Sequence, residues 1–249
     1  MSPMPAFLAC LSAASAALFQ PAAADPAARI VAVSGVVELP EGALAFVPPG
    51  LEAPAPLLVL LHGGGGSPKE MLGRFRDAAV RRGIILLAPK STGATWDMVE
   101  EIGRARRALV RTAPTARLSV DPPRINRAFH ALRPFVHIDP GRVAIGGFSD
   151  GATYALTVGT ANPPLFRTLL IFSPGMAYLS GGDHAGQRLF LSHGRKDPVL
   201  SFDASRSRFV PALIAAGLQV TFRPFDGLHE IPDDVLDDAF TFWLGPADR

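Results

Sequence analysis

Three side chains of this sequence are of the types that carry out nucleophilic catalysis, and they occur in an informative order. Ser149 lies in the pentad Gly147-Phe148-Ser149-Asp150-Gly151, between an apolar β-branched run and a stretch of helical character. A serine at such a strand-to-helix turn has a strained backbone, and flanking glycines prevent collisions with neighbouring segments. Asp197 and His229 follow on loops after two later predicted strands. Serine needs a base that takes its proton and a carboxylate that orients the base, so we expect a Ser149-Asp197-His229 triad.

Other acidic and histidine residues fit these roles less well. Asp183 precedes the strand that should carry the acid, and Asp226 is too close in sequence to His229 to lie behind its ring. His184 and His193 precede or flank the acid, and we interpret both as loop or supporting histidines. The triad assignment therefore rests on order along the chain as well as on residue type.

A glycine run, Gly63 to Gly66, follows the most apolar predicted strand. A tetrahedral intermediate needs N–H donors aimed at its oxyanion. The amide of Asp150, at the positive end of the helix after the nucleophile, is one expected donor. Gly64 is the first choice for the second donor and Gly65 the alternative. We expect His62, which begins the run, to stabilise the loop. The run has no phosphate-loop pattern and no dinucleotide-binding fingerprint.

The stretch from Pro89 to Val120 is interpreted as a long irregular loop, a kind that is usually functional in compact domains. Trp96 within it either lines the substrate pocket together with Gly65 or anchors the loop in the core. We interpret the arginine run from Arg104 to Arg111 as a solvated helix face rather than an anion-binding site. The histidines are scattered and no H-E-x-x-H occurs, so neither a metal ion nor a cofactor is expected.

The remaining elements position this chemistry in a sheet. A hairpin at the start precedes an alternation of strands and helices, which predicts a mostly parallel sheet with helices on both faces. The predicted strands are Arg29–Leu39, Ala43–Val47, Leu57–Leu61, Ile84–Ala88, Val143–Phe148, Leu169–Phe172, Leu189–Ser192 and Val220–Arg223. The predicted helices run from Ser67 to Gly83, Asp121 to Leu132, Ala152 to Val158, Phe202 to Ala216 and Pro232 to Leu244. The short connection between Phe172 and Leu189 leaves no room for a large cap domain.

Length and composition fit one large α/β domain, assigned to residues 25–249. The chain has 249 residues, of which 48% are hydrophobic and 18% charged, as in globular proteins that bury a substantial core. The 24 basic and 22 acidic residues are largely interleaved, and no long basic stripe occurs. A nucleic-acid partner is therefore not expected.

Residues 1–24 differ in character from the rest of the chain. An apolar run from Ala6 to Phe19 is followed by Ala22-Ala23-Ala24, which resembles a signal-peptidase site, so we expect export to the periplasm or the exterior. The run is shorter than the roughly 20 residues of a membrane span, so stable insertion of the mature chain is not expected. No Lys or Arg precedes the run, and a cytoplasmic location is the alternative. The single cysteine, Cys10, lies here, which excludes disulfides and cysteine chemistry in the mature chain.

Several of these motifs together resemble those of bacterial α/β-hydrolase esterases. They are Leu60-Leu61-His62-Gly63-Gly64-Gly65, Asp139-Pro140-Gly141-Arg142-Val143, Gly147-Phe148-Ser149-Asp150-Gly151-Ala152, His193-Gly194-Arg195-Lys196-Asp197-Pro198-Val199 and Gly227-Leu228-His229. The chain is most similar to the phospholipase/carboxylesterase group, near the polyhydroxybutyrate depolymerase and feruloyl esterase group. The secreted depolymerases generally carry disulfides, which favours the carboxylesterase side.

The resemblance implies an α/β-hydrolase fold and a serine hydrolase that cleaves carboxylic esters of small molecules through an acyl-enzyme. It also implies Ser149, Asp197 and His229 as the triad. A polyester depolymerase and a feruloyl or acetyl esterase are the alternatives. A peptidase and a non-catalytic binding protein on a hydrolase scaffold are less favoured. The substrate and the oligomeric state are left open.

Overall fold

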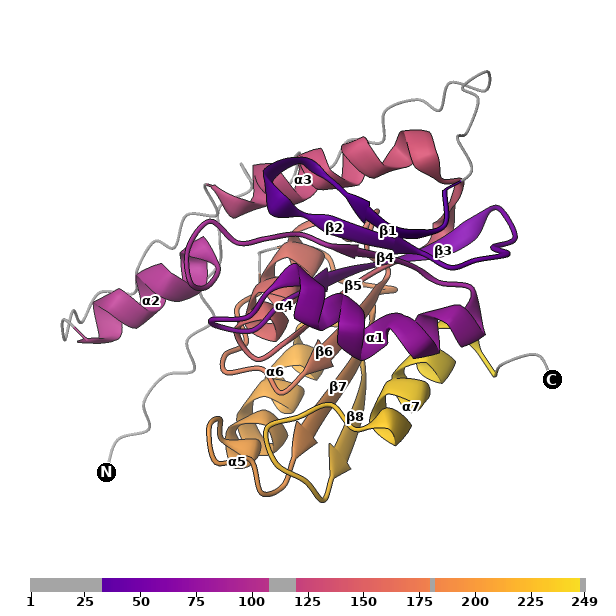
Figure 1. Cartoon of the computed structure of the whole chain (residues 1–249). Helices are drawn as coiled ribbons and strands as arrows, with labels where there is room; N and C mark the ends of the chain where they lie inside the picture. Colours follow the sequence, from indigo (N-terminus) through magenta and orange to yellow (C-terminus); the bar gives the residue numbers. More distant parts are fainter. Residues whose placement is uncertain (1–32, 108–119, 180–181, 247–249) are drawn as a thin grey trace, which may run out of the picture.

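The computed structural model describes residues 33–107, 120–179 and 182–246 (Figure 1). The predicted signal peptide lies outside these ranges, and so do residues 108–119 and the side chains of residues 104–107 in the arginine run. The expected signal peptide and the expected solvated face of the arginine run therefore stay predictions. Within the described ranges, no helix combines the length and the apolar character that a membrane span requires.

The described strands form one sheet of eight, in the order β1-β2-β4-β3-β5-β6-β7-β8. They are β1 (Gly35–Glu38), β2 (Leu44–Val47), β3 (Ala55–Leu61), β4 (Ile85–Ala88), β5 (Ile138–Phe148), β6 (Thr168–Phe172), β7 (Arg188–Gly194) and β8 (Gln219–Phe225). Strand β2 is antiparallel to both β1 and β4, and all other neighbouring strands run parallel. The predicted hairpin and the mostly parallel sheet are thus confirmed.

Helices cover both faces of the sheet (Figure 1). They are α1 (Pro68–Arg82), α2 (Asp97–Arg107), α3 (Asp121–Leu132), α4 (Asp150–Ala161), α5 (Phe202–Ala204), α6 (Val210–Ala215) and α7 (Asp233–Leu244), with short 3-10 turns at Pro40–Gly42 and Arg133–Phe135. Apolar side chains of α1 and α7 share one buried cluster with the sheet, and those of α2, α3, α4 and α6 share another. Every residue of β3 is buried between these layers.

Local sequence signals set several helix boundaries. The hydroxyl of Ser67 accepts the N–H of Glu70 at the start of α1, and Gly83 ends this helix with φ 59°, as predicted. The predicted helix from Phe202 to Ala216 is helical as far as Ala215, with a π-helical turn at Ser205–Phe209 that separates α5 from α6.

The interpretation of residues 89–120 as an irregular loop is wrong at its centre, because α2 lies there. Ile102 follows Met98 by four residues and Val99 by three, and all three are buried against the core. This spacing is the signal of an amphipathic helix.

Asp121 has the residue type of a helix cap, but it is the first residue of α3, and Val120 is the N-cap residue, with no side-chain hydrogen bond. The buried carboxylate of Asp121 instead accepts the N–H of Asp97 at 2.8 Å, where α2 begins, and the N–H and hydroxyl of Thr92 at 2.8 and 2.6 Å. The Asp97 carboxylate in return accepts the N–H groups of Val120 and Asp121. Each aspartate therefore binds the N-terminus of the other's helix, and we call this pair the Asp97–Asp121 clasp.

We expect Asp121→Ala to lower the free energy of unfolding by about 2 kcal/mol, because two backbone N–H groups and one hydroxyl lose their acceptor. Urea denaturation measures this change. Asp183→Ala is the matched control, since the one donor that this exposed carboxylate has among the described residues is the nearby N–H of Ala185. Equal stability of the two variants would show that the clasp contributes nothing.

Candidate active site

Ser149 lies at the turn between β5 and α4, as predicted. Its backbone has φ 57° and ψ −119°, a strained conformation for a residue with a side chain. The N–H of Ser149 donates to the carbonyl of Phe172 at 3.0 Å, and its carbonyl accepts the N–H of Thr153 at 3.1 Å. These bonds fix the turn on both sides.

Both glycines of the pentad are sterically required. A β-carbon on Gly147 would collide with the carbonyl oxygens of Gly151 and Leu61. A β-carbon on Gly151 would collide with the carbonyl oxygens of Leu61 and His62 at the end of β3. The expected collisions at both positions are thus present, and they come from backbone atoms that have no room to move aside.

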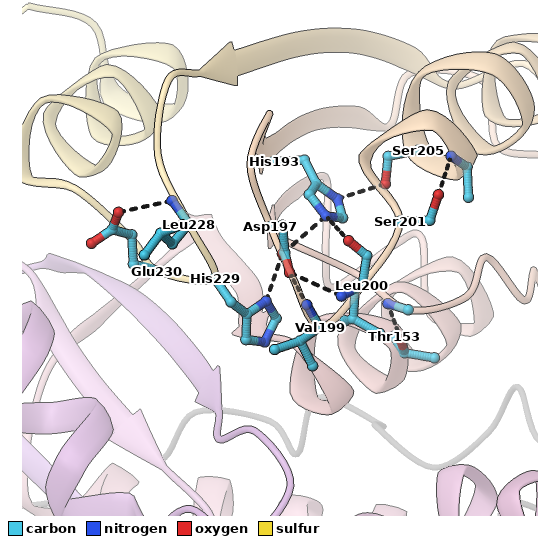
Figure 2. A network of polar contacts seen from close by, with 12 residues as sticks. Thr153, His193, Asp197, Val199, Leu200, Ser201, Ser205, Leu228, His229 and Glu230 are labelled. Carbon is cyan, nitrogen blue, oxygen red and sulfur yellow. Dashed lines mark hydrogen bonds and ion pairs between the residues drawn. The ribbon is translucent and has the colours of Figure 1, made fainter.

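Asp197 and His229 meet at the carboxyl ends of β7 and β8, which are neighbours in the sheet. The Nδ1 of His229 lies 2.7 Å from Oδ2 of Asp197, and the Asp197 side chain is fully buried (Figure 2). The imidazole of His229 packs against the ring of Phe148, the residue before Ser149, with 4.5 Å between the ring centroids. The loops of Asp197 and His229 are therefore adjacent, and the turn that carries Ser149 meets them through Phe148.

The two loops that carry the acid and the histidine are joined through their backbones. The N–H of Arg195 donates to the carbonyl of Phe225 at 2.8 Å, and that of Lys196 donates to the carbonyl of Gly227 at 3.0 Å. Gly194 permits this approach, because a β-carbon there would collide with the carbonyl of Leu228. Glu230, which sequence reasoning missed, accepts the N–H of Leu228 at 3.0 Å. The only sequence signal for it was its place beside His229.

The environment keeps the carboxyl group of Asp197 ionised. Burial by itself raises the pKa of this group, but hydrogen bonds from the N–H of Leu200, from His229 and from the N–H of Val199 outweigh burial. The resulting pKa lies below the usual value of an aspartate. A negative charge behind the imidazole favours the ring that carries its proton on Nδ1.

The glycine run approaches the turn at Ser149. A β-carbon on Gly64 would lie 2.6 Å from Oδ2 of Asp150, and this carboxylate also accepts the hydroxyl of Thr95 at 2.8 Å. The N–H of Gly65 is used in a 2.7 Å bond to the carbonyl of Ala94. The N–H of Gly64 has no acceptor among the described residues, and Asp150 opens α4, where N–H groups lack intrahelical acceptors.

His62 stabilises the glycine run through a hydrogen bond to its first residue. Its Nδ1 donates to the carbonyl of Gly63 at 2.8 Å, and its Nε2 accepts the N–H of Ser91 at 3.2 Å, so the ring is neutral. Burial lowers the pKa of His62. Trp96 donates from Nε1 to the carbonyl of His62 and stacks on Tyr154. Trp96 is completely buried, which favours the core-anchor interpretation over a pocket-lining one.

An open cleft of about 480 Å³ lies beside His229. One wall is Phe148 with His229, a second is the glycine run, and the third comes from α1 and the loop before α7. The residues that line it are His62, Gly63, Gly64, Gly66, Glu70, Met71, Arg74, Phe148, His229, Glu230 and Ile231. Gly65 and Trp96, the two expected pocket residues, are not among these.

Lowering the pH should destabilise the protein through His62. Because burial lowers the folded-state pKa, the unfolded chain takes up the proton first, and stability is lost as the pH falls below about 6.5. We expect His62→Asn, which keeps a donor for the Gly63 carbonyl, to reduce the loss between pH 7 and 5 in urea titrations. His137→Asn replaces an exposed histidine and serves as control. Identical pH dependence in all three proteins would contradict this role.

Comparison with known proteins agrees with these observations. Residues 43–243 match the family model described as phospholipase/carboxylesterase. No curated protein sequence matches the chain. A carboxylesterase from Mesorhizobium loti is 22% identical with a TM-score of 0.61, and the match covers 86% of this chain and 100% of that one.

Two further solved structures show the same fold. Esterase PE8 is 21% identical with a TM-score of 0.55, and the match covers 85% of this chain and 98% of that one. The carboxylesterase of Bacillus cereus is 17% identical with a TM-score of 0.57, with 80% and 92% covered. The fold is thus the expected α/β-hydrolase fold. Since the family model spans most of the sequence, the chain belongs to the phospholipase/carboxylesterase family and is a carboxylic ester hydrolase.

Proposed function

We propose that this esterase hydrolyses small carboxylic esters through an acyl-enzyme, with Ser149 as nucleophile, His229 as general base and Asp197 as the group that orients His229. The observation that carries the proposal is the 2.7 Å bond between Asp197 and Nδ1 of His229. With its proton on Nδ1, the imidazole leaves Nε2 free to accept a proton. The strained turn at Ser149 supports the role of nucleophile.

The reaction has two halves with the same proton acceptor. In the first, Nε2 of His229 takes the hydroxyl proton while Ser149 Oγ attacks the ester carbonyl, and the N–H groups of Gly64 and Asp150 stabilise the oxyanion. His229 then gives the proton to the leaving alcohol as the ester C–O bond breaks. In the second half, His229 takes a proton from water as the water oxygen attacks the acyl carbonyl. His229 then returns this proton to Oγ of Ser149 as the acyl C–O bond breaks, which releases the acid and free Ser149.

The lining of the cleft favours the binding of short acyl groups over long ones. Met71, Phe148 and Ile231 supply apolar surface, while Glu70, Arg74 and Glu230 contribute charged groups to the same lining. The guanidinium of Arg74 is paired with Asp233 at 2.8 Å and donates to the carbonyl of Ile231. A long alkyl chain would have to cover these charges, which costs free energy because they would lose water without new partners.

Ser149→Ala should lower kcat/KM by about 10⁴-fold or more, because the nucleophile is lost. Steady-state assays with p-nitrophenyl butyrate measure this, and circular dichroism monitors the fold. Ser207→Ala, at an exposed serine far from the cleft, is the matched control and should retain the wild-type rate. A fluorophosphonate should label Ser149 in the wild type and not in Ser149→Ala. Wild-type turnover by Ser149→Ala would refute the assignment.

A series of p-nitrophenyl esters from acetate to palmitate tests the substrate proposal. We expect kcat/KM to be highest for the short acyl chains and to fall for the long ones, because a long chain would have to cover the charged groups that line the cleft. The assay needs substrate below its aggregation concentration, so that physical state and chain length are separated. A rate that rises steadily to palmitate would contradict a short-chain preference without affecting the triad.

A further inference from the structure

A second histidine contacts the carboxylate that orients His229. His193 is the second-to-last residue of β7 and is completely buried. Its Nε2 is 3.1 Å from Oδ2 of Asp197 and 3.2 Å from the carbonyl oxygen of Leu200, and its Nδ1 is 2.8 Å from Oγ of Ser205 (Figure 2). Asp197 thus lies between two imidazoles, of which only that of His229 reaches the cleft.

The partners of His193 determine which of its nitrogens carries the proton. Nε2 faces two oxygens that only accept, a carboxylate and a carbonyl, so Nε2 is the donor. Nδ1 faces a hydroxyl, which can donate to it. The neutral ring with its proton on Nε2 therefore satisfies all three contacts at once. Burial lowers the pKa of His193, which agrees with a neutral ring.

With His193 included, the Asp197 carboxylate has two donors on each oxygen. Oδ1 accepts the N–H groups of Val199 and Leu200 at 2.8 and 2.9 Å, and Oδ2 accepts His229 at 2.7 Å. Nε2 of His193 lies 3.1 Å from Oδ2, and its N–H is shared between this oxygen and the carbonyl of Leu200. A carboxylate held at all of its acceptor positions has one orientation. Without His193, Oδ2 would keep His229 as its only donor.

We propose that His193 is a positioning residue of the esterase, which holds Oδ2 of Asp197 in line with His229, and that Ser205 acts through His193 by fixing the orientation of its ring. This inference rests on the triad proposed above and adds two residues that support it. His193 touches neither the cleft nor the reacting atoms. Its effect reaches the reaction only through the carboxylate.

The backbone around Ser205 fits this role. Ser205 is completely buried and begins the π-helical turn between α5 and α6. Such turns are uncommon and occur frequently at functional sites. Phe202 of α5 packs edge-on against the ring of His193. The guanidinium of Arg195 lies over the ring of Phe202, 5.3 Å from its centroid. Within the described part of the chain, the ionised group in direct contact with His193 is the carboxylate of Asp197.

Substitution of His193 tests the proposal. We expect His193→Leu to lower kcat by about 10- to 100-fold, the effect of losing a hydrogen bond to a charged group, with KM for p-nitrophenyl butyrate within about twofold. His193→Gln, which keeps an N–H donor near the place of Nε2, should restore kcat to within about threefold of the wild type. His184→Leu is the matched control, because His184 is also buried but bonds Gln187, away from the triad.

Ser205→Ala provides a milder test that needs no large change in the core. The loss of the hydroxyl leaves Nδ1 of His193 without its donor and removes one of the bonds that fix the ring, so kcat should fall by about threefold. Glutamine has no atom that corresponds to Nδ1, so Ser205→Ala should have no effect on kcat when combined with His193→Gln. An equal effect of Ser205→Ala in both backgrounds would overturn the action of Ser205 through His193.

The remaining outcomes separate this inference from the proposed triad. If Ser149→Ala is inactive while His193→Leu and His184→Leu have the same kcat, the positioning role is overturned and the triad stands. If His193→Gln is as slow as His193→Leu, the donor role of Nε2 is overturned. If Ser149→Ala keeps the wild-type rate, the triad and this inference fail together.

Discussion

Backbones that touch without side chains between them are the constraint on which the site depends. At the carboxyl end of β5, Gly147 and Gly151 let the turn pack directly on the carbonyl oxygens at the end of β3. Gly194 does the same between the loops that follow β7 and β8. The strain at Ser149 is held by this packing and by hydrogen bonds on both sides. The strained turn at Ser149 and the close packing of the backbone thus depend on the same glycines at the carboxyl ends of the strands.

Much of this arrangement was predictable because its signals are local. Buried parallel strands appear as short apolar runs such as Leu57–Leu61, and helix ends appear as single residues such as Ser67 and Gly83. The proximity of Asp197 and His229 was also predictable, since each follows a strand and carboxyl ends of neighbouring parallel strands lie together. Order along the chain was sufficient there because the sheet supplies the third dimension.

The features that sequence reasoning missed depend on contacts across long separations. Asp121 has the residue type and position of a helix cap, yet its carboxylate binds groups 24 and 29 residues away. The bond from the N–H of Gly65 to the carbonyl of Ala94 is another such contact, which no pattern in the glycine run reveals. Likewise, the bond between His193 and Ser205 needs a π-helical turn that the apolar periodicity of the helix does not show.

The Asp97–Asp121 clasp has a consequence for how this fold can change. It joins the two ends of the intervening segment at one point, through bonds that involve none of the residues between them except Val120. The entropy of closing such a segment grows only slowly with its length. Insertions that follow α2 and precede Val120 are therefore cheap for the rest of the molecule, whereas deletions that reach Met98, Val99 or Ile102 would remove side chains from the core. The clasp marks a junction at which a segment of different length can be accommodated while the sheet stays as it is.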